Sequence, residues 1–109
     1  MQVLNLIRPE KSSIKYKVIQ FPDGEPHIVL KDIDRKDYLS VICRICNPTD
    51  LFILMQVGDI LNRQGVLFSL NITYLMSMRM DRVISYDESF SLSIVAQVIN
   101  NMSPQAVHV

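Results

Sequence analysis

The sequence has no excess of charge of either sign and very few cysteines. Eleven lysine and arginine residues balance eleven aspartate and glutamate residues, so the formal net charge is zero. A protein that binds nucleic acid without regard to sequence is expected to carry a basic excess. Two cysteines are too few to indicate a disulfide framework. These absences exclude a nonspecific nucleic-acid binder and a disulfide-rich scaffold, but not a protein that binds a small anionic ligand.

The sequence also lacks a long hydrophobic run and the common glycine-rich phosphate motifs. Its longest apolar stretch, residues 51–58, is too short to cross a bilayer and contains Gln56. Near the amino terminus, Arg8 and Lys11 follow the first apolar residues, whereas a signal peptide carries its charge before them. No P-loop, G-x-G-x-x-G motif or nucleophile elbow is found. We therefore expect a cytoplasmic protein that contacts no membrane and no nucleic acid.

The 109 residues suit a single compact domain. Hydrophobic residues make up 49 % of the chain, which is enough for a domain of this size to bury a core. In the first third, residues 3–7 indicate a strand. Residues 14–21 alternate apolar and polar side chains, as a half-buried strand does. A turn around Gly24 and a return strand at residues 27–30 predict an antiparallel hairpin with its tip at residues 21–26.

The rest of the chain alternates strands with helices. Asn47 and Pro48 are typical of a helix start, and Gly65 is typical of a helix end. In the second helix we expect Ile94, Val98 and Ile99 to face inward. The expected strands are residues 38–45, 66–75 and 106–109, and the expected helices are residues 49–64 and 89–101. This order predicts an α/β domain with a mainly parallel sheet flanked by helices and an added amino-terminal hairpin. Since the chain ends inside an expected strand, we expect it to be a truncated protein.

Charged side chains gather where the central strand is expected to end. Residues 74–82 (YLMSMRMDR) place Arg79, Asp81 and Arg82 within four positions. Ligands of parallel α/β sheets bind at the carboxyl ends of the strands, and two guanidiniums beside a carboxylate suit a phosphorylated ligand. The alternative interpretation is a solvated loop that contains an internal ion pair.

The expected hairpin tip carries an aromatic ring and two carboxylates. Phe21 in FPDGE (residues 21–25) could stack on a purine, while Asp23 and Glu25 could accept hydrogen bonds from its exocyclic amine. The alternative is a plain turn, because Asp and Gly are common turn residues.

Taken together, the two segments resemble the ribose-phosphate pyrophosphokinase family. Its members have an F-x-D-G-E hairpin near the amino terminus and, about fifty residues later, a P-Y-x-x-Y-x-R-Q-D-R segment after a central strand. The resemblance covers essentially all of residues 1–109 and implies the amino-terminal, ATP-side domain of such a protein. It also implies a phosphoribosyltransferase-like fold.

The resemblance implies an activity and a nucleotide site. Enzymes of this family transfer diphosphate from MgATP to ribose 5-phosphate, giving phosphoribosyl diphosphate and AMP for nucleotide biosynthesis. Phe21 would then stack on adenine, and Asp23 and Glu25 would contact its polar edge from a neighbouring subunit of a homo-oligomer. Arg79 would cover the other face of the adenine. Asp81 and Arg82 match the motif and would have a supporting role.

Several of the family's working parts have no counterpart in these residues. In the family, three such parts follow the region that corresponds to Val109. They are the histidine that helps bind magnesium, the basic catalytic loop and the acidic loop that holds the ribose phosphate. We assign no metal ligand and no catalytic residue here, and we expect these 109 residues alone to be inactive. Met80 stands where the family has glutamine, which favours a second hypothesis of a non-catalytic oligomerisation or regulatory relative. A third is a thioredoxin-like redox protein that uses Cys43 and Cys46, which form a C-x-x-C motif.

Overall fold

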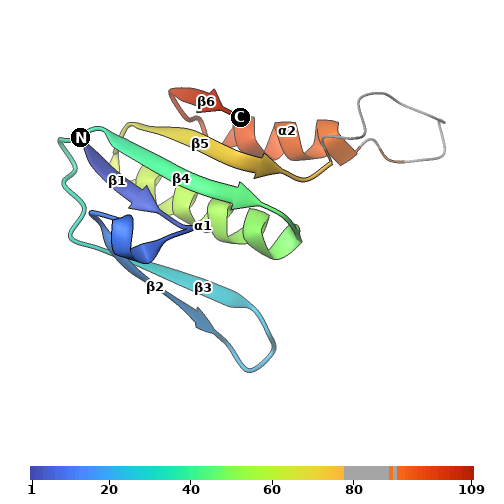
Figure 1. The fold of residues 1–109 in the computed structure, drawn as a ribbon, viewed down its shortest axis with the longest axis horizontal. Helices are drawn as coiled ribbons and strands as arrows, with labels where there is room; N and C mark the ends of the chain where they lie inside the picture. The colour runs from blue at the N-terminus through green and yellow to red at the C-terminus, as the bar shows by residue number, and fades with distance from the viewer. Residues whose placement is uncertain (78–88, 90) are drawn as a thin grey trace.

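The computed structural model describes residues 1–77, 89 and 91–109. It has an α/β fold, built from a four-stranded sheet, a separate two-stranded hairpin and two α-helices (Figure 1). Its strands are β1 (Gln2–Asn5), β2 (Lys15–Gln20), β3 (Pro26–Lys31), β4 (Leu39–Ile45), β5 (Phe68–Leu75) and β6 (Ala106–His108). The helices are α1 (Pro48–Gln64), α2 (Ser91–Asn101) and a short 3-10 helix, η1 (Pro9–Lys11).

The larger sheet has the order β1-β4-β5-β6, and all of its neighbouring strands are parallel. Strands β2 and β3 pair with each other in antiparallel register and form the hairpin as a sheet of their own. These features confirm the prediction of a parallel α/β sheet with an amino-terminal hairpin. The carboxyl ends of β4 and β5 point to the same edge of the sheet (Figure 1).

Helix α1 begins and ends at the residues that the sequence indicates. The Asn47 side chain accepts a hydrogen bond of 2.9 Å from the backbone N–H of Asp50, which satisfies one of the free donors of the first turn. At the other end Gly65 has a φ of 71°, a left-handed conformation that glycine adopts at little cost. Both boundaries of α1 therefore follow from local sequence.

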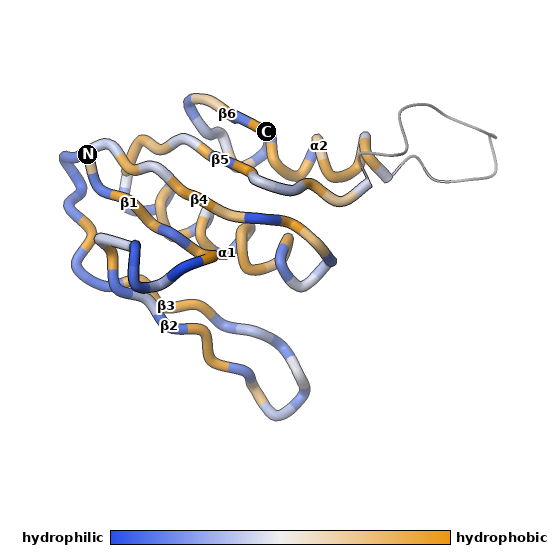
Figure 2. The backbone as a smooth tube through the Cα atoms, viewed as in Figure 1, coloured by the Kyte–Doolittle hydropathy of each residue, from blue (hydrophilic) through white to orange (hydrophobic). Residues whose placement is uncertain are grey.

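The core lies between the sheet and the helices, and hydrophobic residues recur along β4 and α1 (Figure 2). Strand β4 buries Leu39, Val41 and Ile45 completely, and α1 buries Leu54, Val57 and Leu61 in return. At about 25 cal/mol per Å² of apolar area, each of these side chains contributes roughly 1.5–3 kcal/mol to stability. Helix α2 lies beside α1, since the Asn62 amide donates to the carbonyl oxygen of Met102 over 2.9 Å.

The inward face of α2 differs from the prediction. Ile94 is 51 % exposed, whereas Val95 and Ile99 are buried, together with Met102 just after the helix. Positions 95, 99 and 102 form one stripe at i, i+4 and i+7, and Ile94 lies about 100° away from position 95 around the helix. The prediction that Ile94 faces inward was wrong, while Ile99 is buried as expected.

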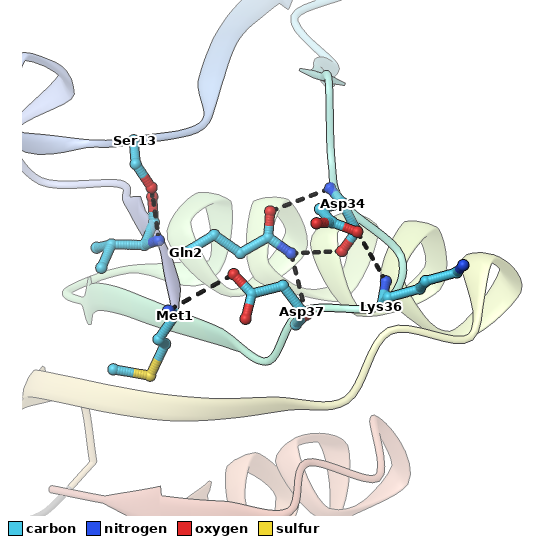
Figure 3. A network of polar contacts seen from close by, with 7 residues as sticks. Met1, Gln2, Ser13, Asp34, Lys36 and Asp37 are labelled. Carbon is cyan, nitrogen blue, oxygen red and sulfur yellow. Dashed lines mark hydrogen bonds and ion pairs between the residues drawn. The ribbon is translucent and has the colours of Figure 1, made fainter.

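Strand β1 ends two residues earlier than predicted, and the connector before β4 (residues 32–38) is hydrogen-bonded to it. The Asn5 side chain accepts hydrogen bonds from the backbone N–H groups of Ile7 and Arg8, so β1 turns away after Asn5 instead of continuing to residue 7. Gln2 holds the connector, since its amide donates to the carbonyl oxygens of Asp34 and Asp37 (Figure 3). Polar contacts of Gln2 and Asn5 therefore fix the two ends of β1.

Candidate functional site

The tip of the hairpin is an ordered turn. The backbone N–H of Phe21 donates to the carbonyl oxygen of Glu25 over 2.9 Å. The backbone N–H of Gly24 donates to the carbonyl oxygen of Phe21 over 2.8 Å. Gly24 has a φ of 93°, where a side chain would introduce strain. The turn therefore holds Phe21, Asp23 and Glu25 close together, as expected of a tip at residues 21–26.

The Phe21 ring is accessible on the hairpin. It is 40 % exposed and stacks on the imidazole of His27, with 5.3 Å between ring centroids and 26° between ring planes. Aromatic rings at such separations attract each other, and an exposed ring offers a surface for a further planar group. His27 thus supports Phe21 from the return strand. Sequence reasoning missed this contact, because the stack depends on the β2–β3 register, in which His27 lies opposite Ile19.

The two carboxylates of the tip differ in their local contacts. One oxygen of Asp23 accepts a hydrogen bond of 2.9 Å from the backbone N–H of Glu25, so it also stabilises the turn. Both residues are exposed, and neither forms an ion pair within residues 1–77, 89 and 91–109. The free acceptor oxygens suit a ligand that donates hydrogen bonds, such as an exocyclic amine.

The hairpin is fixed to the body of the domain by Gln56 of α1. The side-chain oxygen of Gln56 accepts from the backbone N–H of Ile28 over 2.9 Å, and its amide donates to the carbonyl oxygen of Pro26 over 2.8 Å. Ile28 itself is buried in the hydrophobic core. These contacts lie at the tip-proximal end of β3, so they fix the position of the tip relative to α1.

The second segment that the sequence predicts to bind a ligand, residues 74–82, is described only as far as residue 77. Arg79, Asp81 and Arg82 lie outside the described residues, so their position relative to the hairpin stays a prediction. The strand that leads into them, β5, ends at Leu75 on the edge where parallel α/β sheets bind their ligands.

The two cysteines occupy different environments. Cys43 is buried, and burial, together with the negative charge of Asp50, raises the pKa of its thiol from 9.0 to about 12. Cys46 is exposed, and its backbone N–H donates to the Asp50 carboxylate. A reactive C-x-x-C motif needs a lowered thiol pKa, so the environment of Cys43 speaks against the redox hypothesis.

A small cavity between the hairpin and the sheet was not predicted from the sequence. It has a volume of about 150 Å³ and lies near the start of α1. The alternation of β2 places Tyr16 and Val18 on one face, but the approach of α1 to that face depends on tertiary packing. The lining residues are Leu6, Tyr16, Val18, Cys43, Arg44, Asp50 and Ile53.

No protein-family model matches this chain, and no curated protein matches it significantly. Within the part of the chain that the structure describes, no helix is long and apolar enough to cross a membrane. Over the same residues, no three His, Cys, Asp or Glu side chains are grouped so that they could hold a metal ion.

Proposed function

We propose that the chain is the amino-terminal, ATP-side domain of a ribose-phosphate pyrophosphokinase. The observation that carries the proposal is the hairpin tip, where an exposed, supported Phe21 ring lies in the same ordered turn as two exposed carboxylates. A planar base with an exocyclic amine complements this combination. The parallel order β1-β4-β5-β6 is compatible with a phosphoribosyltransferase-like fold, which is part of the proposal.

In the proposed site the adenine stacks on Phe21, and its amine donates to Asp23 and Glu25. Arg79 covers the opposite face of the base, with Asp81 and Arg82 in support. The hairpin of one subunit serves the nucleotide site of its neighbour, so a homo-oligomer is part of the proposal. Magnesium, ribose 5-phosphate and the catalytic step require groups that these 109 residues do not supply, and the whole protein would be cytoplasmic.

Calorimetric titration with MgATP tests this proposal. Stacking of one base on an aromatic side chain contributes about 1–3 kcal/mol, so we expect Phe21→Ala to weaken binding by about tenfold or more, and Arg79→Ala to weaken it as well. Val18→Ala is the matched control, because Val18 is exposed on the same hairpin but lies away from the tip. Equal affinities for the wild type, Phe21→Ala and Val18→Ala would contradict the proposal.

Met80 favours a second candidate, a non-catalytic relative that keeps the domain for assembly. Methionine lacks the side-chain amide that the family's glutamine offers to a nucleotide. This candidate predicts normal assembly and no change in nucleotide affinity in Phe21→Ala and Arg79→Ala. The same titrations, accompanied by sedimentation of each variant, therefore separate the two candidates.

A further inference from the structure

Strand β4 continues past the end of β1, so part of its edge has no neighbouring strand (Figure 1). Where β1 stops, the backbone N–H of Leu6 donates to the carbonyl oxygen of Ile42 over 2.8 Å. Alternate residues of a strand present their backbone groups to the same side, so Arg44 is the next residue of β4 that faces this way. The chain has turned away after Asn5, and within the described residues no strand pairs with Arg44 there. The edge therefore offers one backbone donor and one backbone acceptor.

The cavity between the hairpin and the sheet lies against this edge, since Leu6 and Arg44 both line it. Residues of β2 and of the first turns of α1 form its other walls. Parallel α/β sheets bind their ligands at this position, beside the carboxyl ends of the strands. The cavity measures about 150 Å³, and a protein cavity of about that volume holds a molecule such as benzene. Its ligand is therefore a small molecule.

Part of the cavity wall is apolar. Leu6, Tyr16 and Ile53 pack against the hydrophobic core but stay partly exposed. The Tyr16 hydroxyl donates to the backbone oxygen of Asn5 over 2.7 Å, so this polar group already has a partner. Cys43 adds a buried thiol, which its raised pKa keeps neutral. Such a wall favours an aliphatic group of the ligand, because contact removes apolar surface from water.

Two residues of opposite charge, Arg44 and Asp50, also line the cavity. Neither forms an ion pair with any residue in the ranges 1–77, 89 and 91–109. One oxygen of the half-buried Asp50 carboxylate accepts a hydrogen bond of 2.9 Å from the backbone N–H of Cys46, which leaves the other oxygen for a ligand. Two residues of extended chain, as from Arg44 to Cys46, span at most about 7 Å. One small molecule can therefore contact both the free backbone edge and the carboxylate.

From these contacts we propose that the cavity binds a free α-amino acid with a small aliphatic side chain. Its ammonium group donates to Asp50 and to the carbonyl oxygen of Arg44, while its carboxylate accepts from the Arg44 backbone N–H and pairs with the guanidinium. The aliphatic side chain lies against Leu6 and Ile53. An α-amino acid matches the site because it carries both charges beside one apolar group. None of the residues 21–26 lines the cavity, so the proposal does not depend on nucleotide binding at the hairpin tip.

Calorimetric titration of the chain with L-valine, without nucleotide, tests the proposal. We expect saturable binding at a single site. Isobutylamine is valine without its carboxylate, and isovalerate is valine without its ammonium group. Both should bind at least about tenfold more weakly, because each loses a charge-assisted hydrogen bond. The proposal is overturned if millimolar L-valine does not bind, or if either analogue binds as tightly as L-valine, since the cavity would then recognise only one charge.

Two variants locate the site. Asp50→Asn removes the charge but keeps an oxygen that can accept from Cys46, and it should weaken valine binding at least about tenfold. Ile53→Trp fills the cavity without changing a charge and should abolish binding. Asp59→Asn is the matched control, because Asp59 lies on the same helix but pairs with Arg63 and does not line the cavity. Valine affinity that Asp50→Asn leaves unchanged, or that Asp59→Asn lowers equally, would reject the site.

Discussion

At the scale of single residues, the environment of Cys43 determines how its thiol reacts. Burial holds this thiol neutral, and only the thiolate is a nucleophile. We predict that a disulfide reagent at mildly alkaline pH labels Cys46 at once and Cys43 only as the chain unfolds. Cys43→Ala should remove the slow phase and leave the fast one. Fast labelling of both thiols, or an intramolecular disulfide between them, would restore the redox hypothesis.

The Cys43 thiol also makes the free energy of unfolding depend on pH. Its pKa is raised in the folded state, so folding favours the neutral form, and this contribution is fully present below a pH of about 9. It is lost as pH rises from 9.0 towards 12, since the unfolded chain then releases a proton that the folded chain retains. The free energy of unfolding of the wild type should therefore fall across this range by more than that of Cys43→Ala.

At the scale of elements, one side chain couples the hairpin to α1. In Gln56→Ala, the N–H of Ile28 and the carbonyl of Pro26 lose their partner, and each buried group left unpaired costs about 1–3 kcal/mol. We predict that amide hydrogen exchange in β3 becomes at least about tenfold faster, while β4 and β5 keep their protection. Gln97→Ala, on the exposed side of α2, should change neither. Unchanged exchange at Ile28 would show that apolar packing alone fixes the hairpin.

The elements also show what the sequence can and cannot predict. The ends of α1 were predictable because Asn47 and Gly65 act within one turn of the chain. The inward face of α2 was not, since Ile94, Val95, Val98 and Ile99 allow two overlapping apolar stripes, and only packing against the sheet selects one. The contact of Gln56 with Ile28 spans 28 residues, and no local pattern indicates it.

In the candidate site, too, the features set by neighbouring residues were predictable, and those set by distant contacts were not. FPDGE predicts a turn with an exposed ring because the chemistry of Gly24 and Asp23 is local. The support of Phe21 by His27 depends on strand register, which the sequence did not specify. The role of Arg79 depends on a contact between distant segments and stays a prediction.

At the scale of the whole molecule, the hairpin and the end of α2 contact α1 at different residues. The hairpin is fixed to α1 through Gln56, whereas the end of α2 meets α1 at Asn62. Neither contact covers the hairpin tip, where Phe21 is 40 % exposed.

The most direct test of the central claim, that the hairpin tip binds the adenine of ATP, is a nuclear magnetic resonance titration of the labelled chain with MgATP. We predict that the backbone amide signals of Phe21, Gly24 and Glu25 and the ring protons of Phe21 shift progressively. The amide signals of Lys36 and Asp37, in the connector before β4, should stay in place. In Phe21→Ala the shifts at the tip should disappear. A titration in which the tip signals do not move, or move no more than those of the connector, would contradict the account.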